Sequence, residues 1–135
     1  MIILAPISVG ELYDKITILQ VKSERMTDPA KLAKVSRELD ELQRIAAEKV
    51  GIGATLYQGE LDRMVGDLRK INAELWDIED GKRAAEDRKA FDEHFIQLAR
   101  DVYIKNDRRA AIKLSINNLT GSTIVEVKSH KGASA

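Results

Sequence analysis

Apolar side chains recur at steps of three and four residues between positions 61 and 78, and this repeat constrains the fold more than any other feature. The repeat consists of Leu61, Met64, Leu68, Ile71, Leu75 and Ile78. Such spacing places all of these side chains on one face of an α-helix. We therefore predict a helix that begins near Thr55, ends at about Gly81 and is about 40 Å long.

Three further helices are predicted, each with a sequence signal at its ends. The first follows Ser8, which forms a capping box in which the Glu11 carboxylate reaches back to the Ser8 amide. The second follows Asp28, which precedes a proline, and the fourth lies between Asp92 and Gly121. Their apolar faces are formed by Val9, Leu12, Ile16 and Leu19, by Leu32, Val35, Leu39, Leu42 and Ala46, and by Phe95, Leu98, Val102, Ile112, Ile116 and Leu119.

The order and length of these helices predict the fold class. Residues 82–90 are highly charged and lack an apolar stripe, so we place the turn between the third and fourth helices there. Long helices joined by short turns fold back antiparallel. We therefore predict an all-α protein of four helices with a long antiparallel helical hairpin. Residues 1–129 should form a single helical domain, and residues 130–135 a frayed C-terminal tail.

The two ends of the predicted domain carry short β-branched segments, residues 2–4 and residues 123–127. Either they pair into a small β-ribbon, or they pack on the helices as extended arms. No basic leader and no run of about 20 apolar residues is present. We therefore expect a cytoplasmic protein that does not bind a membrane.

Composition excludes several classes of site. Cysteine is absent, so disulfides, thiolate zinc sites and cysteine nucleophiles are excluded. Two histidines cannot form a three-histidine zinc site, and we predict no metal site. The 22 basic and 22 acidic residues give zero formal net charge. With only one short, aromatic-poor basic patch, at residues 100–113, we expect no binding of nucleic acid.

That basic patch also interrupts the apolar face of the fourth helix. Lys105 and Arg109 occupy core-facing steps four residues apart, and Asn106 and Asp107 lie between them. Burying such charges costs several kcal/mol unless they are paired. Their partners must come from other helices, from a second chain or from an anionic ligand. The structural interpretation is an interhelical salt-bridge layer or a solvent-facing bend, and we favour it.

Two other groups of polar residues are not explained by packing alone. One contains Glu11, Asp14, Lys15 and Thr17, and the other contains Asn72, Trp76, Glu79 and Asp80. Surface pairs between residues four apart account for part of each group. We expect Lys105 and Arg109 to meet Glu11, Asp14 or Asp80 in one polar layer. Asn72 and Asn106 would complete its hydrogen bonds, and Trp76 would flank it.

A different interpretation assigns an enzyme activity to pairs of carboxylates. Glu38 and Glu41, and Glu74 and Asp77, each lie three residues apart on one helix face. All-α nucleotide pyrophosphatases use similar pairs to bind Mg²⁺, which prefers oxygen ligands. The alternative to a binding module is therefore an enzyme that binds an anionic ligand, such as a Mg-dependent pyrophosphatase. Under the first interpretation no cofactor is expected, and Mg²⁺ is expected only under this one.

Several blocks of the sequence resemble one known family. They are residues 8–19, 72–80, 95–103, 106–110 and 126–129, which together span nearly the full length. In these blocks the chain resembles DUF6165, a family of short bacterial and phage proteins without an assigned activity. The resemblance implies no reaction, and it suggests a place beside sugar-transfer and surface-polysaccharide proteins. We therefore predict a non-enzymatic helical binding or assembly module, accessory to surface-glycan biosynthesis, that forms a homodimer or binds a protein partner.

Overall fold

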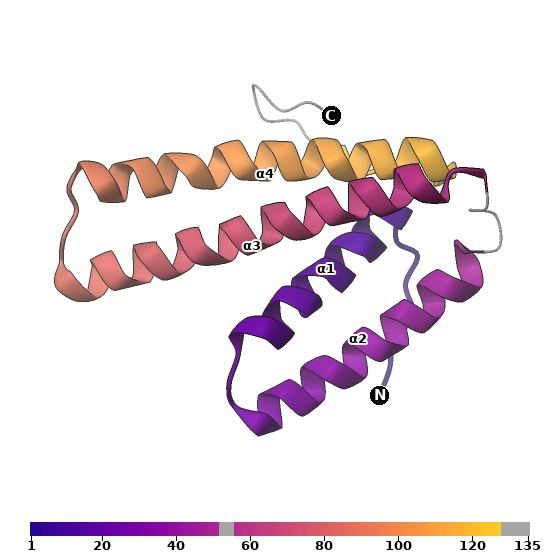
Figure 1. Cartoon of the computed structure of the whole chain (residues 1–135), viewed down its shortest axis with the longest axis horizontal. Coiled ribbons are helices and arrows are strands. Elements are labelled where there is room, and N and C mark those ends of the chain that lie inside the picture. The colour runs from indigo at the N-terminus through magenta and orange to yellow at the C-terminus, as the bar shows by residue number, and fades with distance from the viewer. Residues whose placement is uncertain (52–55, 128–135) are drawn as a thin grey trace.

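The structure, a computed structural model, describes residues 1–51 and 56–127. These residues form four α-helices and no strand, which confirms the predicted all-α class. The helices are α1 (Val9–Arg25), α2 (Pro29–Lys49), α3 (Gln58–Arg88) and α4 (Glu93–Thr120). The two longest, α3 and α4, lie antiparallel as a hairpin, as predicted (Figure 1).

Helix ends follow the predicted capping residues. Side-chain oxygens of Ser8, Asp28 and Asp92 accept hydrogen bonds from the amides of Glu11, Ala30 and Phe95 at 3.0, 3.0 and 3.2 Å. Gly121 ends α4 in the left-handed region, with φ 68°, which a residue without Cβ adopts readily. Only half of the first capping box is formed, because the Glu11 carboxylate contacts Lys113 instead.

The predicted turn over residues 82–90 is wrong, because α3 continues to Arg88. The chain turns at Lys89, which is in the left-handed region and donates its amide to the carbonyls of Ala85 and Glu86. Residues 82–88 are rich in Lys, Arg, Ala and Glu, which favour helix even where no apolar stripe is present. Ala85, 1% exposed, is the apolar contact of this segment. Thr55, near which we expected α3 to start, lies outside the described residues.

All four helices contribute to one apolar core. Its buried members are Leu12, Ile16, Ala46, Val50, Leu61, Leu68 and Ile116. In α1, α3 and α4 these residues come from the predicted apolar faces, and in α2 Ala46 does so. The core lies where α1 packs between α2 and the hairpin, while the end of the hairpin near the α3–α4 turn extends beyond it (Figure 1).

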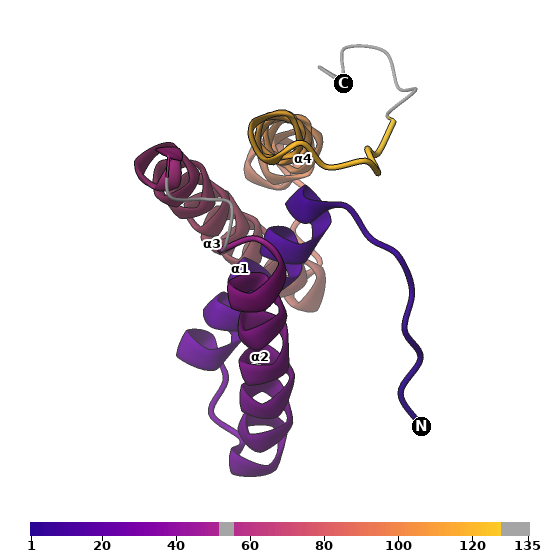
Figure 2. The same cartoon turned by 90° about the vertical axis from the view of Figure 1, so that its right-hand side faces the viewer.

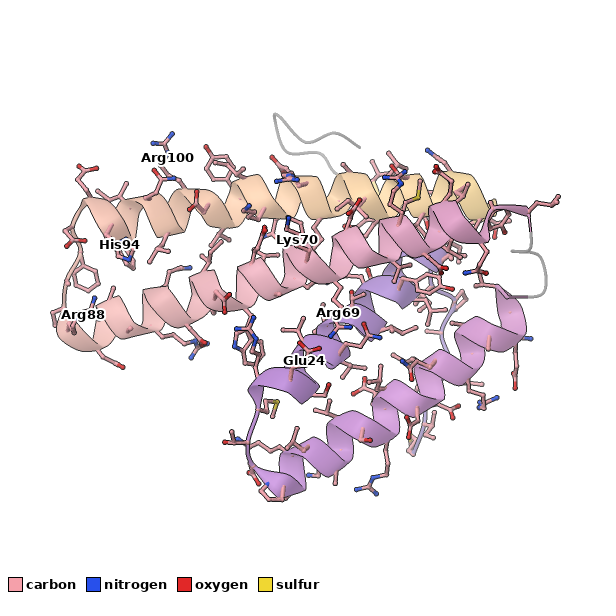
Figure 3. All side chains as sticks on the ribbon, in the orientation of Figure 1. Glu24, Arg69, Lys70, Arg88, His94 and Arg100 are labelled. Atoms are coloured by element: carbon pink, nitrogen blue, oxygen red, sulfur yellow. The ribbon has the colours of Figure 1, made fainter. Side chains whose placement is uncertain are left out.

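Helix α1 is the element that joins the others. It packs against α2, α3 and α4, whereas α2 packs mainly against α1. At its C-terminal end, Glu24 forms an ion pair with Arg69 of α3, and Arg25 forms one with Asp77. Figure 3 shows Glu24 and Arg69 pointing toward one another between the two helices. These exposed pairs contribute little free energy, so the apolar core and the buried polar contacts described below hold α1 in place.

The predicted β-ribbon is not present in the described part of the chain. Residues 2–4 and 123–127 form no strand. The segment before α1 extends away from the segment that follows α4 (Figure 2). Ser122 instead accepts a hydrogen bond from the Val9 amide of α1, and Glu126 accepts one from Lys113 of α4. These contacts hold the segment after α4 against the two helices. Residues 130–135, predicted to be frayed, lie outside the described residues.

Candidate functional site

A buried carboxylate on α1 is the centre of the candidate site. Asp14 is 1% exposed and lies between the buried residues Leu12 and Ile16 of α1. Its Oδ1 accepts hydrogen bonds from Arg109 Nε at 2.9 Å and from Asn72 Nδ2 at 3.0 Å. Its Oδ2 accepts one from Arg109 Nη2 at 2.5 Å. The guanidinium of Arg109 therefore binds this carboxylate with two parallel hydrogen bonds, the strongest arrangement for such a pair.

Asn72 of α3 and Thr17 of α1 complete the hydrogen bonds around Asp14. The Asn72 amide donates its second hydrogen to Thr17 Oγ1, at 3.0 Å. Thr17 Oγ1 in turn lies 2.8 Å from the carbonyl oxygen of Tyr13 and 3.0 Å from that of Asp14. Asp14, Thr17 and Asn72 are all buried. Because buried polar groups are costly unless hydrogen-bonded, this set fixes the distance between α1 and α3.

Lys113 of α4 places a second cation beside Asp14. Its side chain is 9% exposed, and its Nζ lies 2.7 Å from Glu11 Oε2, 2.7 Å from Glu126 Oε2 and 3.8 Å from Asp14 Oδ2. Burial alone lowers the pKa of Lys113, but the hydrogen bonds that its Nζ donates to Glu11 and Glu126 and the charges of Asp14 and Glu11 outweigh this effect. The pKa of Lys113 is therefore raised, and the side chain stays charged.

Arg109 is held in its charged form in the same way. Burial lowers its pKa, while the hydrogen bonds and charge of Asp14, with smaller contributions from Glu11 and Glu126, raise it above its ordinary value. One buried cation, Lys113, and one partly buried cation, Arg109, therefore face three carboxylates. We call Glu11, Asp14, Asn72, Arg109 and Lys113 the polar cluster.

Beyond the polar cluster, the first turn of α1 is bonded to the end of α4. The Gly10 amide donates to Asn117 Oδ1 at 2.7 Å, and the Val9 amide donates to Ser122 Oγ at 3.2 Å. The first amides of a helix have no partner within the helix. Here α4 and the residues after it supply those partners. A side chain at Gly10 would not fit, because a Cβ there would lie 2.5 Å from the Lys113 carbonyl oxygen.

The structure brings some of the predicted site residues together. Glu11, Asp14, Asn72 and Arg109 meet, and Asn106 Oδ1 accepts a hydrogen bond from Arg109 Nη1 at 3.4 Å. Trp76 lines a small cavity of about 190 Å³ beside Asn72 and Arg109. The expected contact of Arg109 with Asp14 is present.

Other predicted residues lie outside the polar cluster. Lys105 contacts Glu74 at 2.8 Å, not Glu11, Asp14 or Asp80 as expected. That contact is an ion pair without a hydrogen bond to the Glu74 oxygen. Lys15 lies 3.8 Å from Glu11, Glu79 lies 3.4 Å from Arg83, Asp80 is exposed, and Asp107 is partly buried on α4.

Sequence reasoning did not identify Lys113, Asn117 and Glu126 as site residues, and it considered Glu74 only as a member of the carboxylate pair with Asp77. Lys113 and Asn117 extend the four-residue steps of Lys105 and Arg109 along one ridge of α4. Following that ridge beyond Arg109 would have found them. Glu126 carried no signal, because we interpreted its segment as a strand.

The carboxylate pairs of the pyrophosphatase alternative do not form one site. Glu41, exposed on α2, pairs with Arg44, while Asp77 of α3 contacts Arg25. Hydrogen bonding to Arg44 lowers the pKa of Glu41. Within residues 1–51 and 56–127, no three His, Asp or Glu side chains lie together as metal ligands would. None of the helices described is both long and apolar enough to cross a membrane.

Comparison with known proteins places the chain in a family. No curated protein and no solved structure matches it. The model of one family, described as a family of unknown function (DUF6165), matches residues 3–134. That range includes all four helices and every residue of the polar cluster. The chain therefore belongs to the DUF6165 family.

Proposed function

We propose that the protein is a non-enzymatic helical binding and assembly module, and that its polar cluster is a structural clamp. One observation carries this proposal. Asp14 is 1% exposed, and both of its oxygens are already bonded to Arg109, one of them also to Asn72. Lys113 likewise faces three carboxylates. These charges are satisfied within the chain, so they support the packing of α1 on the hairpin more than the binding of a ligand.

The sign of a stability change tests this role. Removing one partner of a buried ion pair leaves an uncompensated charge. We therefore expect Arg109→Ala to lower the free energy of unfolding by about 3 kcal/mol, the lower end of the range because Arg109 is 28% exposed. Arg108→Ala is the matched control, since Arg108 is exposed and no ion pair of it is found in the described residues. It should change stability by less than about 0.5 kcal/mol.

A binding or catalytic role would give a different pattern. Binding sites hold charges ready for a ligand, so Arg109→Ala would then leave the melting temperature of the free protein unchanged or raise it. That result would contradict the proposal. Mg-dependent hydrolysis of a nucleoside triphosphate that is lost in Glu74→Gln would support the pyrophosphatase alternative instead.

The assembly part of the proposal is a homodimer in which the N-terminal arm contacts a second copy. The arm is Met1–Leu4, and its apolar members Ile2, Ile3 and Leu4 are each more than 80% exposed. Exposed contiguous apolar residues mark interaction sites. A formal net charge of zero adds no overall repulsion between two copies.

Light scattering after size-exclusion chromatography tests the dimer. We expect twice the monomer mass for the protein, and monomer mass when Ile2, Ile3 and Leu4 are all replaced by Ser. A monomer at about 100 µM, a concentration at which even a weak dimer with a micromolar Kd would form, would contradict it.

The cellular setting is also part of the proposal. We propose a cytoplasmic location and a role beside surface-glycan biosynthesis, which the family resemblance suggests. Deleting the gene should reduce surface polysaccharide, and the protein should fractionate with the cytoplasm. Unchanged polysaccharide would contradict the glycan role.

A further inference from the structure

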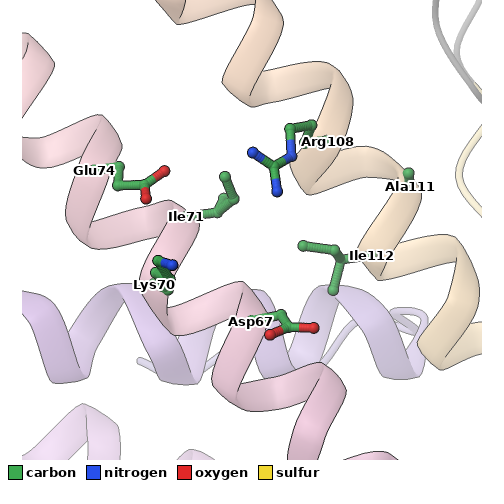
Figure 4. Close-up of a pocket in the computed structure, with 7 residues that line it drawn as sticks. All are labelled: Asp67, Lys70, Ile71, Glu74, Arg108, Ala111 and Ile112. Atoms are coloured by element: carbon green, nitrogen blue, oxygen red, sulfur yellow. The ribbon is translucent and has the colours of Figure 1, made fainter.

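A cleft separate from the polar cluster lies between α3 and α4. It has a volume of about 320 Å³, at the lower end of the range for small-molecule sites. Its lining residues are Asp67, Lys70, Ile71, Glu74, Arg108, Ala111 and Ile112. Figure 4 shows Arg108 extending from α4 toward α3, whose residues line the opposite side. Ile71, 3% exposed, and Ile112 give the cleft an apolar floor.

The charged residues that line the cleft differ in whether they form ion pairs with other residues. Glu74 is already paired with Lys105 at 2.8 Å, and Asp67 lies 3.6 Å from Arg63. For Lys70 and Arg108, by contrast, the described residues supply no ion pair and no hydrogen bond. Both cations are exposed at the cleft, and Figure 3 shows Lys70 between α3 and α4. Among the described residues, the two cations of the cleft therefore have no ion-pair partner, whereas its two acids do.

We propose that this cleft binds a small organic molecule through its phosphate or carboxylate group. A guanidinium presents a planar set of donors that matches two oxygens of such a group, and a nearby ammonium adds a second positive charge. Ile71, Ala111 and Ile112 would cover the apolar part of the same molecule. Asp67, which also lines the cleft, disfavours a ligand with negative charge throughout. The favoured ligand therefore has one anionic end and one apolar end.

The adjacent residues Arg108 and Arg109 have different roles in this arrangement. Successive residues of an α-helix point about 100° apart, so Arg108 and Arg109 leave α4 in different directions. Arg109 is bound to Asp14, which fixes α4 relative to α1. Because these hydrogen bonds set the orientation of α4, they also set the side from which Arg108 extends into the cleft. This inference goes beyond the proposed function and depends on neither a dimer nor a protein partner.

An NMR titration of the full chain with phenyl phosphate tests the proposal. Amide signals of residues 67–74 and 108–112 should shift and saturate, with a Kd of about 1 mM or below. Inorganic phosphate, which lacks the apolar group, should bind about tenfold more weakly, a difference of about 1.4 kcal/mol. Phenol, which lacks the anion, should shift these signals little.

Variants separate a specific site from general attraction. Arg108→Gln should weaken binding of phenyl phosphate at least tenfold, because it removes charge-assisted hydrogen bonds, and Lys70→Gln about threefold. Arg100→Gln is the matched control, as an exposed arginine on α4 away from the cleft (Figure 3), and should leave Kd within twofold.

Three results would overturn the proposal. They are no saturation by about 10 mM phenyl phosphate, an equal loss of affinity in Arg100→Gln, and signal changes confined to other residues. If Arg108→Gln does not keep the helical circular dichroism of the parent protein, Arg108→Lys replaces it, because this change keeps the charge and loses the planar donors. Arg108→Lys should bind phenyl phosphate more weakly than the parent protein, and unchanged affinity would also count against the proposal.

Discussion

Gly10 tests how closely α1 approaches α4. It is the second residue of α1 and is buried against the end of α4. A Cβ at this position would lie 2.5 Å from the Lys113 carbonyl oxygen and 3.0 Å from Asn117 Oδ1. Real Cβ atoms do not approach backbone that closely, so the helices would have to separate in Gly10→Ala. Separation would also stretch the 2.7 Å hydrogen bond from the Gly10 amide to Asn117.

The expected loss of stability follows from these contacts. Overpacking costs about 1–3 kcal/mol, and leaving a buried amide without its acceptor costs about 1–3 kcal/mol more. Alanine regains about 1 kcal/mol through its higher helix propensity. We expect Gly10→Ala to lower the free energy of unfolding by about 1–5 kcal/mol, measured by urea denaturation followed by circular dichroism.

Gly59 provides the matched control, because it is the second residue of α3 and a Cβ there meets nothing within 4 Å. Gly59→Ala should therefore leave stability unchanged or raise it by up to about 1 kcal/mol. If Gly10→Ala behaves like Gly59→Ala, α1 does not pack on α4 as described, and the reasoning is refuted.

Two further predictions concern pH and the core. The pKa of Lys113 is raised from its ordinary 10.5. Burial, with the nearby Asp62 and Tyr57, raises the pKa of Tyr13 from 10.0. A raised pKa in the folded state contributes stability below the ordinary pKa, and this stability is lost as the group deprotonates. Stability should fall as pH rises above about 10, and less so in Lys113→Met; a fall of equal size would contradict the role of Lys113. Leu68→Ala, at a residue 0% exposed, should cost about 2–5 kcal/mol in urea denaturation, whereas Leu56→Ala, 99% exposed, should cost less than about 0.5 kcal/mol; equal costs would place Leu68 outside the core.

Local signals were sufficient to predict most helix boundaries. Ser8, Asp28, Asp92 and Gly121 act within one turn of the chain, and their capping roles depend little on the rest of the fold. The turn over residues 82–90 was mispredicted because this part of α3 carries no such local signal. Its last turns are mostly exposed and bury only the small residue Ala85, so the sequence shows no apolar repeat up to Arg88.

Contacts between distant residues were only partly predictable. The apolar face of α4 showed that Arg109 requires a partner, and Asp14 had no other explanation, so this pair could be anticipated. The partner of Lys105 could not, because several acids on α1 and α3 were equally plausible in sequence and Glu74 was considered only as a metal ligand. Lys113 continues the four-residue steps of Lys105 and Arg109, although taken alone it resembles an ordinary surface lysine.

The clamp between α1 and α4 has a consequence for the order of folding. The residues of its central pair are 95 positions apart in the chain, whereas α3 and α4 are neighbours in sequence. Closing so long a loop is slower than forming a hairpin of adjacent helices. On a ribosome α1 is synthesised before α4, so Arg109 cannot reach Asp14 until it has left the exit tunnel. The contact between α1 and α4 is therefore among the last to form, and the chain must be synthesised beyond Arg109 before this contact can close.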